Sequence, residues 1–196
     1  MTGTDRDDSG TTMIEMVVSL SIMSMVLAMF TTAILSVHRF ANKTESISSA
    51  QTQVNLAFLR LDREVRYAAG LSTPGQVGAD SYVEYLVVAG GIGSCTELRL
   101  HRATGQLQHR TWVHGTAPVV PTGWRQLAMG VSQAQPFTVL PPDETVRYLR
   151  LRLQLTATAG AGTSATSTQT DVTFTARNTS LTTPSASACT EGRAVP

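Results

Sequence analysis

No charged residue occurs in residues 16–37, a run of 22 residues in which apolar side chains predominate. A membrane-spanning helix needs about 20 such residues, because each one advances the helix by only about 1.5 Å. The apolar stretch of a secretory signal is shorter, about 7–15 residues, and it precedes the cleavage site. The run therefore predicts that residues 11–37 form a helix that either crosses a membrane or is covered by neighbouring apolar helices.

One carboxylate, Glu15, lies at the start of this run. A charged side chain at the middle of a bilayer costs on the order of 2.5–3.5 kcal/mol on insertion scales, and less near the edge. An ordinary membrane anchor gains nothing from such a residue, although an edge carboxylate can reach the lipid headgroups. We expect Glu15 to have a cationic partner.

The residues on either side of Glu15 resemble the class III signal of type IV prepilins and pseudopilins. The first ten residues are polar and end in Gly10. The following residues look like the family pattern of Gly, a variable residue, Thr, an aliphatic residue, Ile, Glu and an aliphatic residue: Gly10, Thr11, Thr12, Met13, Ile14, Glu15 and Met16. The resemblance implies that a prepilin peptidase cuts after Gly10 and that the new N-terminal residue, Thr11, is N-methylated. It also implies no cofactor.

Cleavage after Gly10 makes Glu15 the fifth residue of the mature chain and creates a cationic amine at Thr11. Two opposite charges about 4 Å apart attract by about 4 kcal/mol at an effective dielectric constant near 20. Glu15 can therefore neutralise the amine of Thr11 in its own or an adjacent subunit. Because an unpaired buried charge is costly, this pair favours assembly and helps to set the register between helices.

Two features depart from the family pattern, and the second favours a minor subunit over an abundant shaft subunit. The mature chain begins with Thr11, where the family commonly has Phe or another bulky apolar residue. Major pilins also often have a Gly and a Pro inside the helix, and the matching positions here are Ser24 and Thr32.

The helix is expected to continue past the apolar run as an amphipathic segment over residues 38–70. No Pro or Gly occurs in residues 11–69, and a single helix of that length measures about 88 Å. Apolar residues recur at steps of three and four, and they are Ile47, Ala50, Val54, Phe58, Leu61, Val65 and Ala68. We interpret this stripe as the surface on which a sheet lies, with a coiled-coil dimer as the alternative. Gly70 is the expected C-terminal cap.

Residues 71–178 carry the alternation typical of antiparallel strands. The expected strands are residues 81–89, 97–101, 106–113, 146–157 and 170–177, with a hairpin turn through residues 102–105. Residues 179–196 lack periodicity and are expected to be a flexible tail, unless Cys189 ties them to Cys95. The predicted fold class is α+β, with a long N-terminal helix packed on a four-stranded antiparallel sheet, as in pilins.

Later segments also resemble the minor pilins and pseudopilins of the PilW and PulJ type. The resemblance is carried by the helix end at residues 60–70, the hairpin around Gly105, and the closing strand at residues 172–178.

Cys95 and Cys189 are compatible with a disulfide if this part of the chain lies outside the cytoplasm, and otherwise with two separate thiols. The histidines His101, His109 and His114 invite a metal hypothesis. His101 and His109 fall on opposite faces of the expected hairpin, and no Cys or carboxylate cluster stands at ligand spacing. We therefore expect no metal site.

The motifs of nucleophilic catalysis and of phosphate binding are also missing from the sequence, which favours a non-enzyme. The formal net charge is +1 and aromatic residues make up only 6% of the chain. Direct nucleic-acid binding is therefore not expected.

The leading hypothesis is a minor pilin or pseudopilin that assembles into a type IV pilus or a type II secretion pseudopilus. The expected partners are other pilin subunits, the prepilin peptidase, the inner-membrane assembly platform and, before assembly, membrane lipid. The expected location is the cytoplasmic membrane, with the N-terminus inside, and then an extracellular or periplasmic filament. Two alternatives remain: a single-pass anchored binding protein that does not polymerise, and an anchored secreted enzyme.

Overall fold

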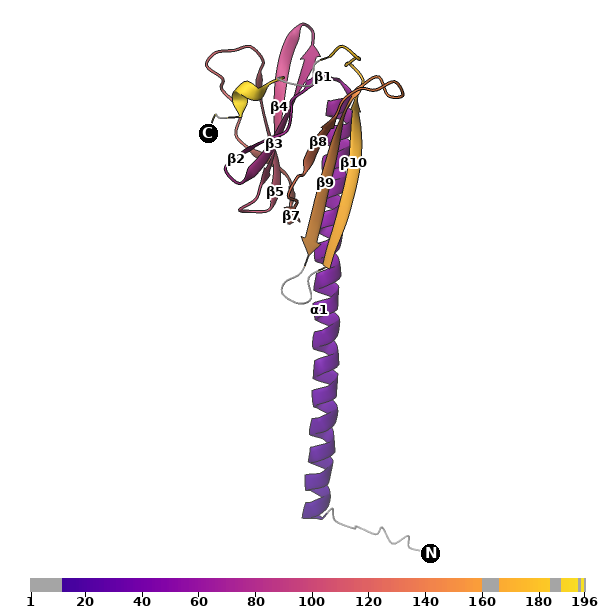
Figure 1. The fold of residues 1–196 in the computed structure, drawn as a ribbon. Coiled ribbons are helices and arrows are strands. Elements are labelled where there is room, and N and C mark those ends of the chain that lie inside the picture. Colours follow the sequence, from indigo (N-terminus) through magenta and orange to yellow (C-terminus); the bar gives the residue numbers. More distant parts are fainter. Residues whose placement is uncertain (1–11, 160–165, 184–187, 194, 196) are drawn as a thin grey trace, which may run out of the picture. The chain divides into compact units, whose positions relative to one another are not determined.

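The computed structural model describes residues 12–159, 166–183, 188–193 and 195 (Figure 1). Gly10 and Thr11 lie outside the described residues. The chain divides into two units, residues 1–44 and residues 45–196. One helix, α1 (Met13–Arg66), runs from the first unit into the second. This helix confirms the expectation of an uninterrupted helix through the apolar run and beyond it.

Helix α1 ends three residues earlier than expected, because the chain turns at Tyr67 and enters strand β1 (Ala68–Leu71). Gly70 is therefore not a helix cap; it lies opposite Leu86 in the sheet. Residues that follow the last strand instead donate hydrogen bonds to the carbonyls at the end of the helix. The Arg177 amide donates to the carbonyl of Arg66 (3.0 Å), and the Asn178 side chain donates to the carbonyl of Tyr67 (3.0 Å).

Among the described residues, the second unit contains two antiparallel sheets in an α+β arrangement. The remaining strands are β2 (Gly75–Val77), β3 (Asp80–Ala89), β4 (Ile92–His101), β5 (Gln106–Val113), β6 (Arg125–Met129), β7 (Val131–Ser132), β8 (Phe137–Leu140), β9 (Leu149–Ala159) and β10 (Thr166–Ala176). A six-stranded sheet has the order β1-β3-β4-β5-β6, with β2 also paired to β3. A four-stranded sheet has the order β10-β9-β7, with β8 also paired to β9.

The prediction of a single four-stranded sheet is therefore wrong. The unpredicted strands β1, β2, β6, β7 and β8 contain only two to five residues each. A strand that short shows little alternation, and its pairing comes from a longer neighbour. The longer strands β3, β5, β9 and β10 lie close to their predicted positions.

The predicted hairpin of β4 and β5 is confirmed in its turn, and His101 and His109 lie on its opposite faces as expected. Residues 102–105 form the turn, and Gly105 has the positive φ of 62° that favours glycine. Leu98 pairs with His109, and Leu100 pairs with Leu107. All four of these side chains are buried on the face of the sheet that contributes to the core.

The apolar stripe of α1 packs on both sheets. Val54, Phe58, Leu61 and Val65 are buried in one core, and the rings of Phe58 and Phe174 meet edge to face at 6.1 Å. Burying each of these large side chains contributes about 1.5–3 kcal/mol. The alternating residues of β9 complete this core: Leu149, Leu151, Leu153 and Leu155. The interpretation of the stripe as a sheet-packing surface is confirmed for residues 54–65, which are not free to form a dimer seam.

The C-terminal segment (residues 188–193 and 195) covers the opposite face of the six-stranded sheet. Cys189 is bonded to Cys95 of β4 in a disulfide, with Cα atoms 5.7 Å apart, and both residues are fully buried. The short helix η2 (Thr190–Gly192) follows and lies against the ring of Trp112. Residues 179–196 were expected to be a flexible tail unless Cys189 was bonded to Cys95. The structure contains that disulfide.

Candidate functional site

The apolar part of α1 is the first candidate site. The segment Met13–Ala41 is long and apolar enough to cross a membrane, and none of its most apolar stretch is buried against the rest of the chain. Its large side chains are exposed, including Met13 (87%), Phe30 (65%) and Phe40 (72%). An exposed apolar surface of this extent marks a site that contacts a membrane or another protein. The segment requires an apolar environment, which lipid or other helices can supply.

Glu15 lies in the first turn of α1. Its amide donates to the carbonyl of Thr12 (3.0 Å), the residue that directly precedes the first helical residue, Met13. The first amides of a helix carry a partial positive charge, which stabilises a nearby carboxylate by about 0.3–1 kcal/mol. The Glu15 side chain is exposed and available for a partner. Gly10 and Thr11, the predicted cleavage and methylation residues, lie outside the described part of the chain.

Four hydroxyl side chains within the apolar segment are hydrogen-bonded to their own helix. The hydroxyls of Ser21, Ser24, Thr31 and Thr32 each donate to a backbone carbonyl three or four residues earlier, at 2.8–2.9 Å. In an apolar environment an unbonded hydroxyl costs several kcal/mol. These bonds remove that cost, so the four residues are compatible with lipid or with a packed helical bundle.

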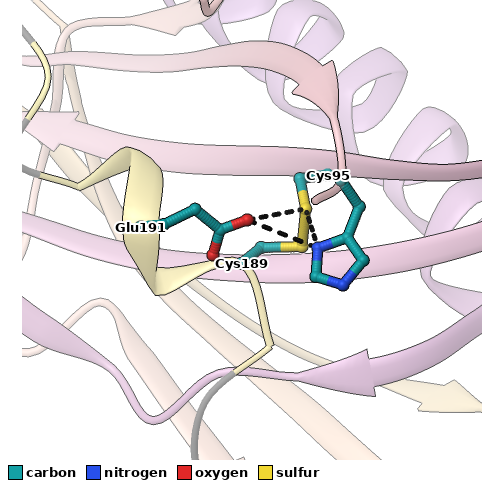
Figure 2. A group of neighbouring side chains, drawn as sticks. Cys95, Cys189 and Glu191 are labelled. Carbon is teal, nitrogen blue, oxygen red and sulfur yellow. Dashed lines mark hydrogen bonds and ion pairs between the residues drawn. A yellow bond between two sulfur atoms is a disulfide. The ribbon is translucent and has the colours of Figure 1, made fainter. Parts of the chain in front are cut away.

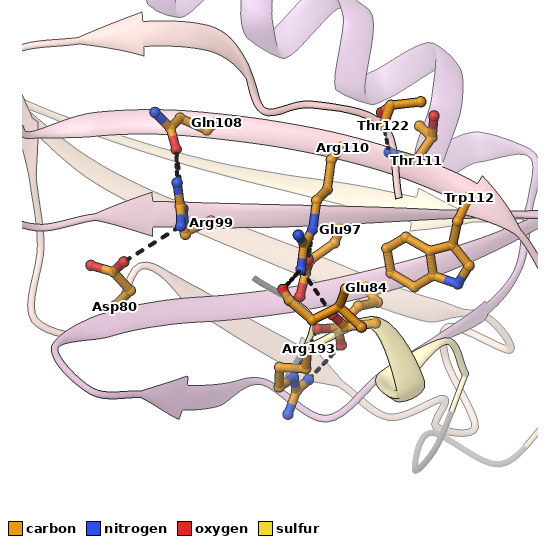
Figure 3. Close-up of polar contacts among 12 residues, drawn as sticks. Asp80, Glu84, Glu97, Arg99, Gln108, Arg110, Thr111, Trp112, Thr122 and Arg193 are labelled. Carbon is orange, nitrogen blue, oxygen red and sulfur yellow. Dashed lines mark hydrogen bonds and ion pairs between the residues drawn. The ribbon is translucent and has the colours of Figure 1, made fainter. Parts of the chain in front are cut away.

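A second candidate is the polar patch beneath the C-terminal segment (Figure 3). Arg110 Nε lies 2.6 Å from Glu97 Oε2, and Arg193 Nε lies 2.8 Å from Glu84 Oε1. Both carboxylates are fully buried. Burial raises the pKa of Glu97 to about 7, although the hydrogen bond and charge of Arg110 act in the opposite direction. The hydrogen bond from Arg193 to Glu84 raises the pKa of Arg193.

This polar patch holds the C-terminal segment against the six-stranded sheet. Arg110 donates to the carbonyls of Gly192 (2.8 Å) and Val195 (2.7 Å), and its guanidinium also lies 4.2 Å from the ring centroid of Trp124. A carboxylate pair in a cleft could serve acid–base chemistry, but here each carboxylate is held by an arginine under the C-terminal segment. The arrangement is suited to holding that segment in place.

The third candidate is a group of side chains around the disulfide (Figure 2). His114 and Glu191 lie beside Cys95 and Cys189, and one ligand atom from each of the four lies within 4.8 Å of the others. The sequence did not predict this group. The pairing of β4 with β5 places His114 opposite Gly93, close to Cys95, and the disulfide brings in Glu191. The signal for this group in the sequence is weak: Glu191 follows Cys189 by two residues.

The other two histidines of the metal hypothesis, His101 and His109, lie apart from this group. His109 is buried in the core, and its pKa is lowered chiefly by burial. His101 lies in β4 with Nδ1 2.7 Å from the hydroxyl of Thr104 and Nε2 3.8 Å from Asp80. His101 and His109 are therefore not placed to bind the same metal ion.

Comparisons of the chain with protein-family models, with curated proteins and with solved structures found no match.

Proposed function

We propose that this chain is a minor pilin or pseudopilin, a structural subunit that assembles through its N-terminal helix after removal of residues 1–10. The observation that carries the proposal is the position of Glu15. It is the fifth residue after Gly10 and the single charged residue between that glycine and the end of an uncharged apolar run. A cationic chain end at Thr11 explains both its charge and its spacing.

The described part of α1 supports this proposal in two ways. Its apolar surface is exposed along Met13–Ala41, so a bundle of such helices would bury it. The hydroxyls of Ser21, Ser24, Thr31 and Thr32 are bonded within the helix, so these four add no unsatisfied groups to a water-poor interior. Assembly would follow membrane insertion, with lipid as the first environment of the helix. Other subunits, the prepilin peptidase and the inner-membrane assembly platform are the proposed partners.

A second candidate is a single-pass membrane protein that binds a ligand and does not polymerise. It is favoured by the charges at the two ends of the apolar run. Arg39 and Lys43 follow the run, whereas acidic residues predominate before it. Basic residues tend to remain on the cytoplasmic side, and that orientation would keep Gly10 away from a cytoplasmic peptidase.

The N-terminus of the protein in its native host distinguishes the two functions. Intact-mass analysis of the membrane and filament fractions is expected to show a chain that begins at methylated Thr11. A Gly10→Val variant is expected to retain residues 1–10, because a branched side chain replaces the glycine at the cut. Gly3→Val, in the same leader, is the matched control and is expected to be processed normally. A functional protein that retains Met1 to Gly10 would contradict the pilin proposal and favour the anchored binding protein.

A further inference from the structure

Four side chains of the types that bind zinc converge from three separate segments of the second unit. Cys95 belongs to β4, His114 directly follows β5, and Cys189 and Glu191 belong to the C-terminal segment. Thiolate sulfur, imidazole nitrogen and carboxylate oxygen are the ligands that Zn²⁺ takes in proteins, and four of them complete a tetrahedral site. The number and chemistry of these groups therefore match a closed zinc site.

The distances among these groups also match a tetrahedron. Zinc bonds of about 2.3 Å to sulfur and about 2.0–2.1 Å to nitrogen or oxygen place the ligand atoms about 3.3–3.8 Å from one another. Cys95 Sγ lies 3.4 Å from His114 Nδ1 and 3.8 Å from Glu191 Oε1. His114 Nδ1 lies 3.3 Å from Glu191 Oε1. Three ligand atoms thus already have the separations of neighbouring corners.

The remaining edge of the tetrahedron joins the two sulfurs. Here the sulfurs are bonded to each other, and two thiolates on one zinc ion lie about 3.8 Å apart. The disulfide and a zinc site therefore exclude one another. The bond opens when a dithiol supplies two electrons and two protons, which yields two thiols here and a disulfide in the reductant. Binding of Zn²⁺ then releases both thiol protons.

We propose that Cys95, Cys189, His114 and Glu191 form a redox-controlled zinc site, occupied when the disulfide is reduced and closed to metal when it is oxidised. The two thiolates and the carboxylate together carry three negative charges, which more than neutralise the two positive charges of Zn²⁺. In either state the C-terminal segment stays linked to β4, by a covalent bond or through the metal. The proposal is independent of filament assembly.

The surroundings of the four groups support metal binding. The indole nitrogen of Trp112 donates to Glu191 Oε1 at 3.3 Å, a bond that orients the carboxylate. The amide of His114 is held by the carbonyl of Gly93 at 2.9 Å. The sulfurs are buried, whereas the side chains of His114 and Glu191 are 44% and 36% exposed. An ion can therefore approach from solvent while the protein encloses the sulfurs.

Cobalt titration of the full chain in detergent micelles tests the proposal, with any polyhistidine tag removed. The protein is reduced with a phosphine, which takes up the oxygen of one water molecule, and the reductant is removed under nitrogen. We expect one equivalent of Co²⁺ to give thiolate-to-cobalt charge-transfer absorption and the intense visible bands of a tetrahedral ion. Zn²⁺ should displace the cobalt. The oxidised chain should show neither absorption.

Two variants that leave the cysteines intact locate the site. We expect His114→Ala and Glu191→Ala to weaken binding at least about tenfold, since even groups that only orient a ligand cost about 10–100-fold. The matched controls are His101→Ala and Glu144→Ala, which lie outside the group and should bind normally. Equal binding by His114→Ala, or no tetrahedral spectrum from the reduced chain, would overturn the proposal. If reduction abolishes the near-ultraviolet circular dichroism, recovery on adding metal supports the site, and failure to recover counts against it.

Discussion

The guanidinium of Arg110 is bonded to the carboxylate of Glu97 (Nε to Oε2, 2.6 Å), and solvent reaches only 2% of the arginine side chain and none of the glutamate side chain. The two residues are directly paired across β4 and β5. Water is excluded from them by the C-terminal segment, whose carbonyls at Gly192 and Val195 also accept from Arg110. The ion pair thus connects the hairpin to the end of the chain.

Removal of Arg110 should be strongly destabilising, because it leaves the Glu97 carboxylate buried without its partner. We expect Arg110→Met to lower the free energy of unfolding by roughly 3–5 kcal/mol. Arg152→Met is the matched control, since Arg152 pairs with Asp171 at the surface, and it should be far less destabilising because exposed ion pairs contribute little. Urea unfolding followed by tryptophan fluorescence measures both. Equal losses in the two variants would mean that the buried pair has no special role.

Glu97 should make stability depend on pH in a defined direction. Its pKa is raised from 4.5 to about 7, so between these values the folded chain binds more protons than the unfolded chain. The free energy of unfolding therefore falls as the pH rises from about 4.5 to about 7, and this contribution levels off above that range. Glu97→Gln should lack this slope, whatever its absolute stability.

Other carboxylates do not obscure this comparison. The pKa of Asp143 is lowered chiefly by the backbone amide of Val146, and that of Asp171 by Arg152. Their stabilisation is present above the ordinary Asp pKa and is lost as the pH falls below it. Because both aspartates remain in Glu97→Gln, their contribution cancels in the difference between the two curves. A difference that is constant from pH 4.5 to 7 would contradict the assignment to Glu97.

Gly192 provides a test of how closely the C-terminal segment packs. A Cβ atom at this position would lie 2.4 Å from the ring of Trp112. We expect Gly192→Ala to displace the ring, to change its fluorescence, and to cost about 1–3 kcal/mol, the usual range for overpacking. Gly123→Ala is the control, because a Cβ at Gly123 meets no atom within 4 Å. An unaltered emission spectrum in Gly192→Ala would show that this contact is not tight.

Glu15 provides the functional prediction. Glu15→Gln keeps the size of the side chain but removes its charge, and with it an attraction of about 4 kcal/mol, or roughly a thousandfold in an association constant. We expect normal membrane insertion and no detectable incorporation into filaments. Glu45→Gln removes an exposed carboxylate farther along the same helix and should assemble normally. Fractionation of sheared filaments and membranes measures both, and normal incorporation of Glu15→Gln would contradict the pairing argument.

Much of the α+β fold could be predicted because its signals are local. Residues 11–69 contain no Pro or Gly, and their apolar residues recur at helical steps, so α1 could be placed within a few residues. The alternation of residues 146–157 likewise placed β9 (Leu149–Ala159) to within three residues at each end. Strand β1 could not be found in this way. Its sequence of Ala68 to Leu71 resembles a helix end, and its partner β3 begins only at Asp80.

The sequence by itself determined the apolar helix, the isolated charge of Glu15 and the strands whose alternation is long enough to identify the buried side. Only the tertiary structure decided that Glu97 and Arg110 are buried and that His114 meets Cys95, Cys189 and Glu191. The physical reason is that periodicity reports which side of an element is apolar. It cannot report what covers the polar side, because here the cover is a segment about 80–100 residues farther along the chain.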